Sequence, residues 1–283
     1  MFKIIKKRVL NSAVVLMDIM APAVAHKAEP GQFIILRVND DGERIPLTVA
    51  DFDREAGTVT IIYQVVGKTT QLLSELNEGD KILDFVGPLG MASHLDGYSK
   101  VAVIGGGLGS AIAYPQAKKL HQMGVEVDII AGFRNQDLII LEDEMRAACS
   151  RLFITTDDGS NGHKGFVSDV LKELIEEGNQ YDLVIAIGPL IMMKVVSNLT
   201  RTYGIKTLVS MNPVMIDGTG MCGGCRVTVG GETRFACVDG PDFDGHLVDF
   251  DEAMRRQQMY KKDEKKTMEA HRCRLTGEEH KDA

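Results

Sequence analysis

Three things are scarce in this sequence, and each scarcity excludes a class of function. No run of 18 apolar residues occurs in the 283 residues, so we expect no transmembrane helix and no membrane partner. Basic residues are outnumbered, 32 Lys and Arg against 40 Asp and Glu, which gives a formal net charge of −8. Because binding of nucleic acid needs a basic face, we expect no nucleic-acid partner.

Cysteine is the third scarce feature, with five residues in the chain. Their odd number and the clustering of three fit metal ligation better than a disulfide framework, which also predicts a reducing, cytoplasmic location. Two of the five have no ligand-type neighbours, and we interpret them as ordinary thiols. The clustered residues are Cys222, Cys225 and Cys237, and the isolated ones are Cys149 and Cys273.

The first 25 residues imitate a secretory signal, with a basic start and the small-residue string Ala21-Pro22-Ala23-Val24-Ala25. Polar residues at Asn11, Ser12 and Asp18 interrupt the apolar region. Residues 13–19 also have the composition of a β-strand that leads to a second strand at 32–38. We therefore interpret this segment as the start of a folded domain.

The distribution of apolar runs predicts a β + α/β architecture with several domains. Over 1–97, short apolar runs separated by turn signals predict a small antiparallel β-barrel. Over 98–210, short strands alternate with helices, which predicts a doubly wound parallel sheet. Residues 211–250, rich in Gly and Cys, form a third small domain. The charged tail, 251–283, is either a solvated helix or a frayed end.

The Gly- and Cys-rich segment carries the most specific motif. Plant-type [2Fe–2S] proteins space their ligands as C-x4-C-x2-C with a distant fourth cysteine. Here Cys222, Cys225 and Cys237 occupy the last three positions, and Asp217 stands at the first. Because a carboxylate can ligate iron, the spacing predicts a [2Fe–2S] cluster held by these four residues. The surrounding glycines allow amides to approach the cluster sulfurs.

A zinc site is the alternative, because a C-x2-C knuckle with further donors also binds zinc. The chain would then be a non-catalytic nucleotide-binding regulator with a structural metal. The C-x4 offset and the density of glycine favour the redox cluster over this alternative.

A glycine-rich turn follows the apolar strand at 101–104 and opens a helix. In this context backbone amides and a helix N-terminus bind a pyrophosphate. Two further strand ends, at Asp157 and at Gly188-Pro189, favour a nucleotide site at the carboxyl edge of the sheet. Arg134 suits either a 2′-phosphate or the surface, so the choice between NAD and NADP stays open. The turn comprises Gly106, Gly107, Leu108, Gly109 and Ser110, with Ser110 in place of the third glycine of the usual motif.

The β-rich domain has two weaker signals for phosphate binding. Arg44 precedes Thr48 across an expected proline turn at Pro46. Gly67 to Thr70 opens a helix expected at 70–76, which is another candidate phosphate cradle. A surface charge and an ordinary helix cap are the alternatives for Arg44 and Thr69.

The order of barrel, nucleotide domain and cluster domain resembles the ferredoxin-reductase-like electron-transfer subunits, including that of dihydroorotate dehydrogenase. The opening Ala21-Pro22…Pro30-Gly31-Gln32-Phe33 and the segment from Asn212 to Cys222 carry the resemblance, which covers about 1–250. The Asp-first motif is similar to that of the small (alpha) subunits of NADH-dependent reduced ferredoxin:NADP oxidoreductases, also called sulfide dehydrogenase subunits. The dihydroorotate dehydrogenase subunit, whose motif is expected to begin with Cys, is the alternative.

The resemblance implies FAD in the barrel and NAD(H) as a substrate of the second domain. The FAD phosphates would contact Arg44, and Pro46 stands where the family often has an aromatic residue. The isoalloxazine ring would lie along Pro46, Leu47 and Thr48, with Gly67, Thr69 and Thr70 around the ribityl–pyrophosphate chain. The NAD(H) would lie along Gly106–Ser110, Asp157 and Gly188-Pro189.

The resemblance also implies a heterodimer with a larger iron–sulfur flavoprotein subunit, through which electrons exchange with ferredoxin. The flavin mediates between hydride transfer, which moves two electrons, and the cluster, which moves one at a time. We expect no catalytic side-chain acid or base. The direction of electron flow, the cluster potential and any electron bifurcation are left open by the sequence.

Overall fold

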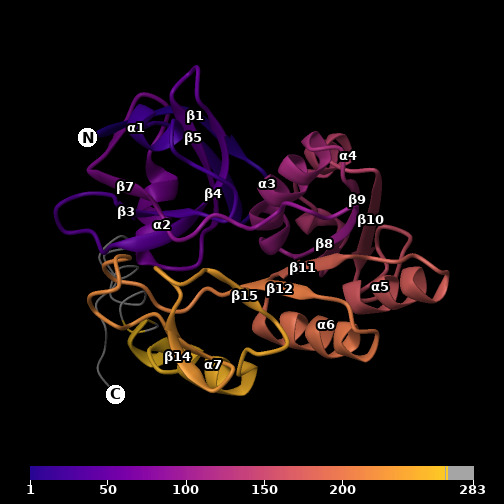
Figure 1. Ribbon diagram of the computed structural model, residues 1–283. Helices are drawn as coiled ribbons and strands as arrows, with labels where there is room; N and C mark the ends of the chain where they lie inside the picture. Colours follow the sequence, from indigo (N-terminus) through magenta and orange to yellow (C-terminus); the bar gives the residue numbers. More distant parts are fainter. Residues whose placement is uncertain (265, 267–283) are drawn as a thin grey trace, which may run out of the picture.

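The computed structural model of the chain describes residues 1–264 and 266, so Cys273 and most of the predicted tail lie outside the described residues. The N-terminal part is a seven-stranded antiparallel sheet that curls into a near-barrel, with strand order β6-β1-β2-β5-β4-β3-β7 (Figure 1). Its strands are β1 (Phe2–Val9), β2 (Val14–Met20), β3 (Phe33–Arg37), β4 (Ile45–Asp53), β5 (Thr58–Gln64), β6 (Lys81–Ile82) and β7 (Asp84–Leu89), with helices α1 (Pro22–Ala25) and α2 (Lys68–Glu75) between them.

Two strands of the near-barrel differ from what the sequence suggests. The basic, signal-like stretch is strand β1, which pairs with β2 and β6 and buries Ile4 completely. The expected proline turn is wrong, because Pro46 lies inside β4, opposite Ile35 of β3. On its other side, β4 pairs with β5 only from Val49 onward, so the missing N–H of Pro46 breaks no bond of that ladder.

The second part is a six-stranded sheet with strand order β10-β9-β8-β11-β12-β15. Its first five strands are parallel, and alternate residues of β8 face opposite cores. Val101 and Val103 pack with residues of α3 and α4, while Ala102 and Ile104 pack with α5 and α6. The doubly wound arrangement is therefore confirmed. The elements are β8 (Lys100–Gly106), α3 (Gly109–Gln122), β9 (Glu126–Phe133), a 3₁₀ turn (Gln136–Leu138), α4 (Glu142–Ala147), β10 (Arg151–Thr156), α5 (Val167–Glu176), β11 (Leu183–Ile187), α6 (Leu190–Thr202) and β12 (Thr207–Ser210).

The C-terminal part, orange to yellow in Figure 1, lies below the other two and contacts both. It contains a hairpin of β13 (Arg226–Val229) and β14 (Glu232–Phe235), then β15 (Asp242–Asp244) and helix α7 (Phe250–Gln257). Strand β15 pairs antiparallel with β12 and so becomes the edge of the parallel sheet. The expected domain limits at 97/98, 210/211 and 250/251 remain predictions.

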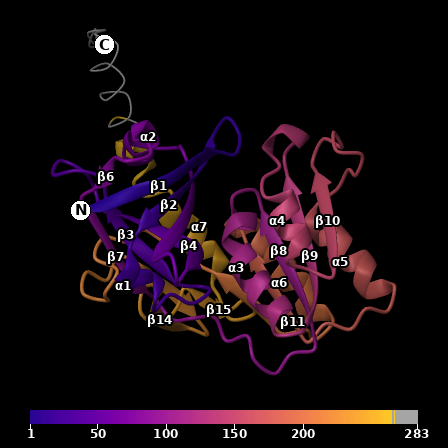
Figure 2. The same cartoon turned by 90° about the horizontal axis from the view of Figure 1, so that it is seen from above.

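Helix α3 lies between the parallel sheet and the near-barrel, as the view from above shows (Figure 2). This arrangement brings the start of α3, the N-terminal half of β4 and the loop after β12 toward one another. None of the helices formed by residues 1–264 and 266 is long and apolar enough to cross a membrane.

Candidate functional site

A cavity of about 880 Å³ opens where the three parts of the chain meet. The carboxyl ends of the parallel strands form its floor, as expected for a ligand site on a doubly wound sheet. The barrel contributes one wall, and the loop after β12 closes another. Eleven of the sixteen residues predicted to bind cofactor line it: Pro46, Leu47, Thr48, Gly106, Gly107, Leu108, Gly109, Arg134, Asp157, Gly188 and Pro189.

The floor of the cavity depends on glycines that bring two strand ends close together. A Cβ on Gly106 would lie 2.5 Å from the Met192 sulfur, and one on Gly188 would lie 3.1 Å from the Gly106 Cα. A Cβ on Gly109 would lie only 2.2 Å from the carbonyl oxygen of Ile187, so α3 can begin here only with glycine. The turn therefore leaves a backbone-lined cradle at the start of a 14-residue helix, which suits a pyrophosphate.

Five predicted cofactor residues lie outside the cavity wall. Ser110 is buried behind the turn, and its hydroxyl has no hydrogen-bond partner among the described residues. Gly67, Thr69 and Thr70 lie instead at the N-terminus of α2, and Arg44 pairs with Asp84 of β7 at 3.8 Å. The Thr69 hydroxyl donates to Glu43 (3.1 Å), which brings the Arg44 segment to this helix end. The Thr70 hydroxyl accepts from the Gly67 amide at 3.0 Å, so Thr70 serves as part of a capping box.

Sequence reasoning missed other parts of the cavity wall. The largest group lies at the end of β12 and in the loop after it. Because ligands bind at the carboxyl ends of parallel strands, this group could have been predicted. Gln64 ends β5, and Gln257 ends α7, which no local pattern links to a nucleotide site. These residues are Asn11, Gln64, Phe166, Met192, Ser210, Met211, Asn212, Met215, Pro241 and Gln257.

The four predicted metal ligands lie just beyond Met215 and are arranged as two pairs. The Asp217 Oδ1 lies 3.1 Å from the Cys222 Sγ, and the Cys225 Sγ lies 3.2 Å from the Cys237 Sγ. Cys222 is exposed and Asp217 is half-buried, whereas Cys225 and Cys237 are 1% and 2% exposed. One pair therefore faces outward and the other faces the core.

The Asp217 carboxylate also organises the ligand loop. Its Oδ2 accepts hydrogen bonds from the Met221 amide at 2.9 Å and the Thr219 hydroxyl at 3.0 Å. The hydrogen bond from the Cys222 thiol, with these two, holds the pKa of Asp217 far below its usual range. A cysteine at this position could ligate a metal but could not hold the loop in this way.

The inner pair has the opposite electrostatic character. Burial, together with the neighbouring Cys225 thiol, raises the pKa of Cys237 to about 12, and the Asp217 charge adds to the rise. The Cys237 thiol is therefore protonated without a metal, and a bound metal must displace its proton. A bound metal cation would lower the pKa of Cys237, because it stabilises the thiolate form.

The two pairs fit a two-iron cluster. In tetrahedral geometry, metal–thiolate bonds of about 2.3 Å place two sulfurs roughly 3.7 Å apart, and a carboxylate oxygen at about 2.1 Å lies roughly 3.6 Å from a thiolate sulfur. Both separations exceed the observed ones by only about half an ångström. In a [2Fe–2S] cluster each iron takes two protein ligands, which matches the pairing of Asp217 with Cys222 and of Cys225 with Cys237. Within the described ranges, no group of three or more His, Cys, Asp or Glu side chains is arranged to hold one ion.

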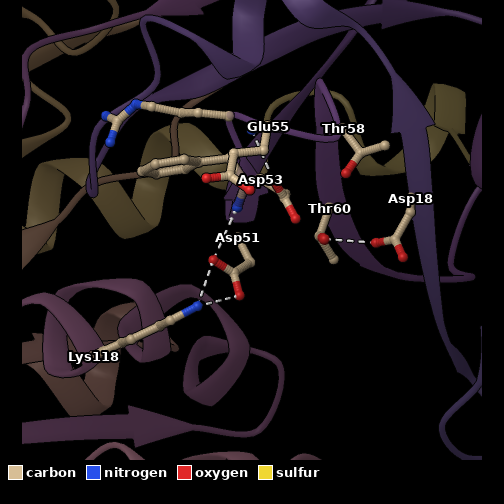
Figure 3. Close-up of a pocket in the computed structure, with 9 residues that line it drawn as sticks. Asp18, Asp51, Asp53, Glu55, Thr58, Thr60 and Lys118 are labelled. Atoms are coloured by element: carbon tan, nitrogen blue, oxygen red, sulfur yellow. Dashed lines mark hydrogen bonds and ion pairs between the residues drawn. The ribbon is translucent and has the colours of Figure 1, made fainter.

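A second cavity, of about 560 Å³, lies at the C-terminal end of β4 and contains none of the predicted site residues. Its acidic side chains point into it from β2 and β4 (Figure 3), and Lys118 of α3 donates to Asp51 at 2.6 Å. This ion pair joins the near-barrel to the nucleotide domain. The remaining lining residues are Asp18, Phe52, Asp53, Arg54, Glu55, Thr58 and Thr60.

Comparison with known proteins agrees with this arrangement. A model of the iron–sulfur cluster binding domain of dihydroorotate dehydrogenase B matches residues 212–249. The chain is 46% identical over 263 residues to a Thermotoga maritima homolog of the dihydroorotate dehydrogenase B (NAD(+)) electron transfer subunit, covering 93% of each. It is 38% identical to the electron transfer subunit of Streptococcus pneumoniae, covering 75% of this chain and 84% of that one.

Comparison with solved structures indicates the same fold. The fold matches a chain of NADH-dependent reduced ferredoxin–NADP oxidoreductase, a protein described for flavin-based electron bifurcation, with a TM-score of 0.90 and 45% identity. That match covers 95% of this chain and 97% of the other. Phthalate dioxygenase reductase shares the fold alone, with a TM-score of 0.59 and 15% identity.

The fold and the site together define an electron-transfer subunit of a ferredoxin-reductase-like oxidoreductase. The chain belongs to the family of dihydroorotate dehydrogenase B electron transfer subunits and their homologues. The resemblance and the fold class expected from the sequence are thereby confirmed, and the relatives are named as subunits of larger complexes.

Proposed function

We propose that this chain is an iron–sulfur flavoprotein subunit that moves electrons between NAD(H), FAD and a [2Fe–2S] cluster, and on to a larger partner subunit in ferredoxin:NADP transhydrogenation. The observation that carries the proposal is the pairing of four ligands beside a cavity at the carboxyl edge of the sheet. When bound, FAD supplies the step from two-electron to one-electron chemistry.

The ligand arrangement favours two irons over one zinc. A structural zinc needs four donors around one centre. The donors here form one outer and one inner pair, joined by the Gly223-Gly224 turn. A zinc-binding regulator is therefore the weaker alternative.

The residues of the cavity position the cofactors and exclude water. They do not exchange protons with the reacting groups. The Gly106–Gly109 turn offers backbone amides to the pyrophosphate of NAD(H). Pro46, Leu47 and Thr48 form the barrel wall along which we place the isoalloxazine ring. We assign the flavin phosphates to Arg44 and the α2 N-terminus, where Gly67, Thr69 and Thr70 meet. No side-chain acid or base is assigned to the reaction.

A larger subunit fits the surface around the outer pair of ligands. Four exposed apolar side chains flank Asp217 and Cys222, and Met221, between the two, is 88% exposed. Apolar side chains gathered beside an exposed redox centre favour a protein partner, because association buries them and shortens the path for electrons. The four are Val214, Ile216, Met221 and Val238.

The partner surface is tested by substitution. Met221→Glu is expected to abolish co-purification of a larger iron–sulfur flavoprotein subunit, measured by native mass spectrometry of tagged chains from the source organism. The matched control is Met123→Glu, at a 42% exposed position that caps the C-terminus of α3. Equal retention of the large subunit by both variants would overturn this assignment.

The cofactors are tested on the full-length chain itself. We expect yellow-brown protein that releases one FAD and two irons per chain and is bleached by NADH. Colourless protein with one zinc would overturn the proposal. The identity of the co-purified large subunit distinguishes ferredoxin:NADP transhydrogenation from dihydroorotate oxidation. A cytoplasmic location is part of the proposal, because the clustered thiols favour a reducing compartment.

A further inference from the structure

The turn between the second and third cluster ligands is held by two arginines from different parts of the chain. The Arg226 guanidinium donates to the Gly223 carbonyl at 3.4 Å, and the Arg256 guanidinium donates to the Gly224 carbonyl at 3.2 Å. Arg226 directly follows the ligand Cys225. Arg256 lies 30 residues after Arg226, in the last turn of α7, outside the segment matched by the cluster-domain family.

The position of Arg256 is set by contacts that do not involve its own side chain. Phe250 at the start of α7 is buried, and the Asp249 side chain caps the helix by accepting from the Glu252 amide at 2.9 Å. The Thr228 hydroxyl of β13 donates to Glu252 at 2.5 Å, and Lys194 of α6 pairs with Asp251 at 2.7 Å. Helix α7 is thus fastened to the cluster domain and to the nucleotide domain at once.

The carbonyl that Arg256 holds belongs to the same peptide as the Cys225 amide. A hydrogen bond to a peptide carbonyl polarises the N–H of that peptide, so the Cys225 amide becomes a stronger donor. The amide of Gly224 itself points at the Cys222 Sγ, 3.4 Å away. The half-buried guanidinium also places a positive charge behind a turn that connects the outer and inner ligands. Hydrogen bonds and local charge are the means by which a protein sets a cluster potential.

We propose that Arg256 is a positioning residue for the [2Fe–2S] cluster, which clamps the Gly223-Gly224 turn and raises the cluster potential. The inference rests on the proposed function, since it assumes that the four ligands hold this cluster. Because reduction adds negative charge, a cation at this place stabilises the reduced cluster more than the oxidised one. The neighbouring Gln257 lines the nucleotide cavity, so one turn of α7 reaches both redox sites.

The test compares two adjacent arginines of α7 in the full-length, cofactor-loaded chain. Arg256→Gln removes the clamp, and Arg255→Gln removes the same charge from an exposed position one residue away. The readouts are the midpoint potential of the cluster, from an EPR-monitored redox titration, and the rate of iron loss to a chelator. We expect R256Q to have a lower potential than both wild type and R255Q, with iron loss about tenfold faster.

Lysine at position 256 keeps a cationic donor but loses the planar guanidinium. We expect R256K to lie between wild type and R256Q on both readouts. If R256Q retains no iron, R256K carries the comparison and must have a potential below that of wild type. If R256Q has the same cluster potential as R255Q, the inference is overturned. If R256Q retains no iron, a cluster potential of R256K equal to that of R255Q overturns it. A wild-type chain without an iron signal would instead overturn the proposed function, so the two failures are distinguishable.

Discussion

Asp217 uses its two carboxylate oxygens for different purposes: Oδ1 lies 3.1 Å from the Cys222 Sγ, while Oδ2 accepts from the Met221 amide and the Thr219 hydroxyl. One oxygen lies where we propose an iron ligand, and the other shapes the loop that carries Cys222. The aspartate is therefore more than a replacement for the usual cysteine.

Substitutions at Asp217 can separate these two purposes. Asp217→Cys keeps an anionic ligand but loses the loop contacts, so we expect two irons per chain, a changed cluster potential and faster loss of iron to a chelator. Asp217→Asn keeps an oxygen for the loop but offers no anionic ligand, so we expect less iron per chain. Iron content and chelator kinetics measure both effects. Wild-type behaviour of both variants would mean that Asp217 binds no iron.

The start of α3 offers a pair of neighbouring positions with opposite expected effects. Gly109→Ala places a Cβ against the Ile187 carbonyl, and we expect a loss of stability of about 2 kcal/mol or more from the strained helix–strand contact. Ser110→Ala removes a buried hydroxyl that has no partner within residues 1–264 and 266, and we expect a gain of about 1 kcal/mol.

Urea denaturation measures both changes, and titration with NADH measures the site. Since Ser110 lies behind the turn, S110A should bind NADH as tightly as wild type. Weaker binding by S110A would place its hydroxyl in the nucleotide site, as the sequence motif suggested.

Much of this architecture could be predicted from local patterns, and the exceptions have physical reasons. The parallel strands were predictable because each is a short apolar run between helices. Strand β1 was not, because it lies toward the edge of its sheet with a single fully buried residue, Ile4, among lysines. The start of strand β4 was not predicted, because Pro46 suggested a turn. The sheet tolerates this proline because β4 does not pair with β5 at that position.

The site shows the same division. Ligand spacing alone indicated Asp217 as the fourth proposed ligand, because all four proposed cluster ligands lie within 21 residues. The contact of Arg256 with Gly224 joins positions 32 residues apart, and the contact of Ser93 with Asp242 joins positions 149 apart. Nothing in the local sequence of either partner indicates such a contact, so tertiary packing alone supplies it.

Asp242 predicts a specific dependence of stability on pH. It lies half-buried at the junction of the three parts, where its Oδ2 accepts from the Ser93 hydroxyl at 2.5 Å and the Gln116 amide at 3.0 Å. Burial raises the pKa of Asp242, although the hydroxyls of Ser93 and Ser210 oppose the rise. Because the folded-state pKa is raised, the stabilisation is fully present below the unfolded pKa and is lost as the pH rises through the folded pKa.

Asp242→Asn cannot ionise and escapes this loss. We expect the free energy of unfolding of D242N to rise relative to that of wild type as the pH increases from about 4, the ordinary aspartate pKa, toward neutrality. Urea denaturation across this range measures the difference. Parallel stability curves for the two proteins would show that Asp242 does not titrate with folding.

Asp128 has the opposite shift. Burial opposes it, but hydrogen bonds from the Arg151 guanidinium (2.8 Å) and the Tyr181 hydroxyl (2.6 Å) lower the pKa of Asp128 overall. Its stabilisation is therefore present above the unfolded pKa and lost as the pH falls through the folded value. We expect Asp128→Asn to cost about 2 kcal/mol at pH 7, because Asp128 is fully buried and is the anionic acceptor for the Tyr181 hydroxyl and for the Arg151 guanidinium, which is itself 40% exposed.

A solvent-accessible ion pair provides the control for Asp128. The pair of Lys118 and Asp51 is about one-third exposed on both sides, so Lys118→Met should cost less than about 1 kcal/mol. Equal losses in the two variants, measured by urea denaturation at pH 7, would contradict the role assigned to burial at Asp128.

The most direct test of the paired ligand set is the Mössbauer spectrum of the full-length chain loaded with ⁵⁷Fe. Asp217 and Cys222 on one iron, with Cys225 and Cys237 on the other, predict two doublets of equal area with different isomer shifts. In the Asp217→Cys variant both irons have two thiolates, and the doublets should converge. A single iron site, or two doublets that the D217C substitution leaves unchanged, would contradict the assignment of these four ligands.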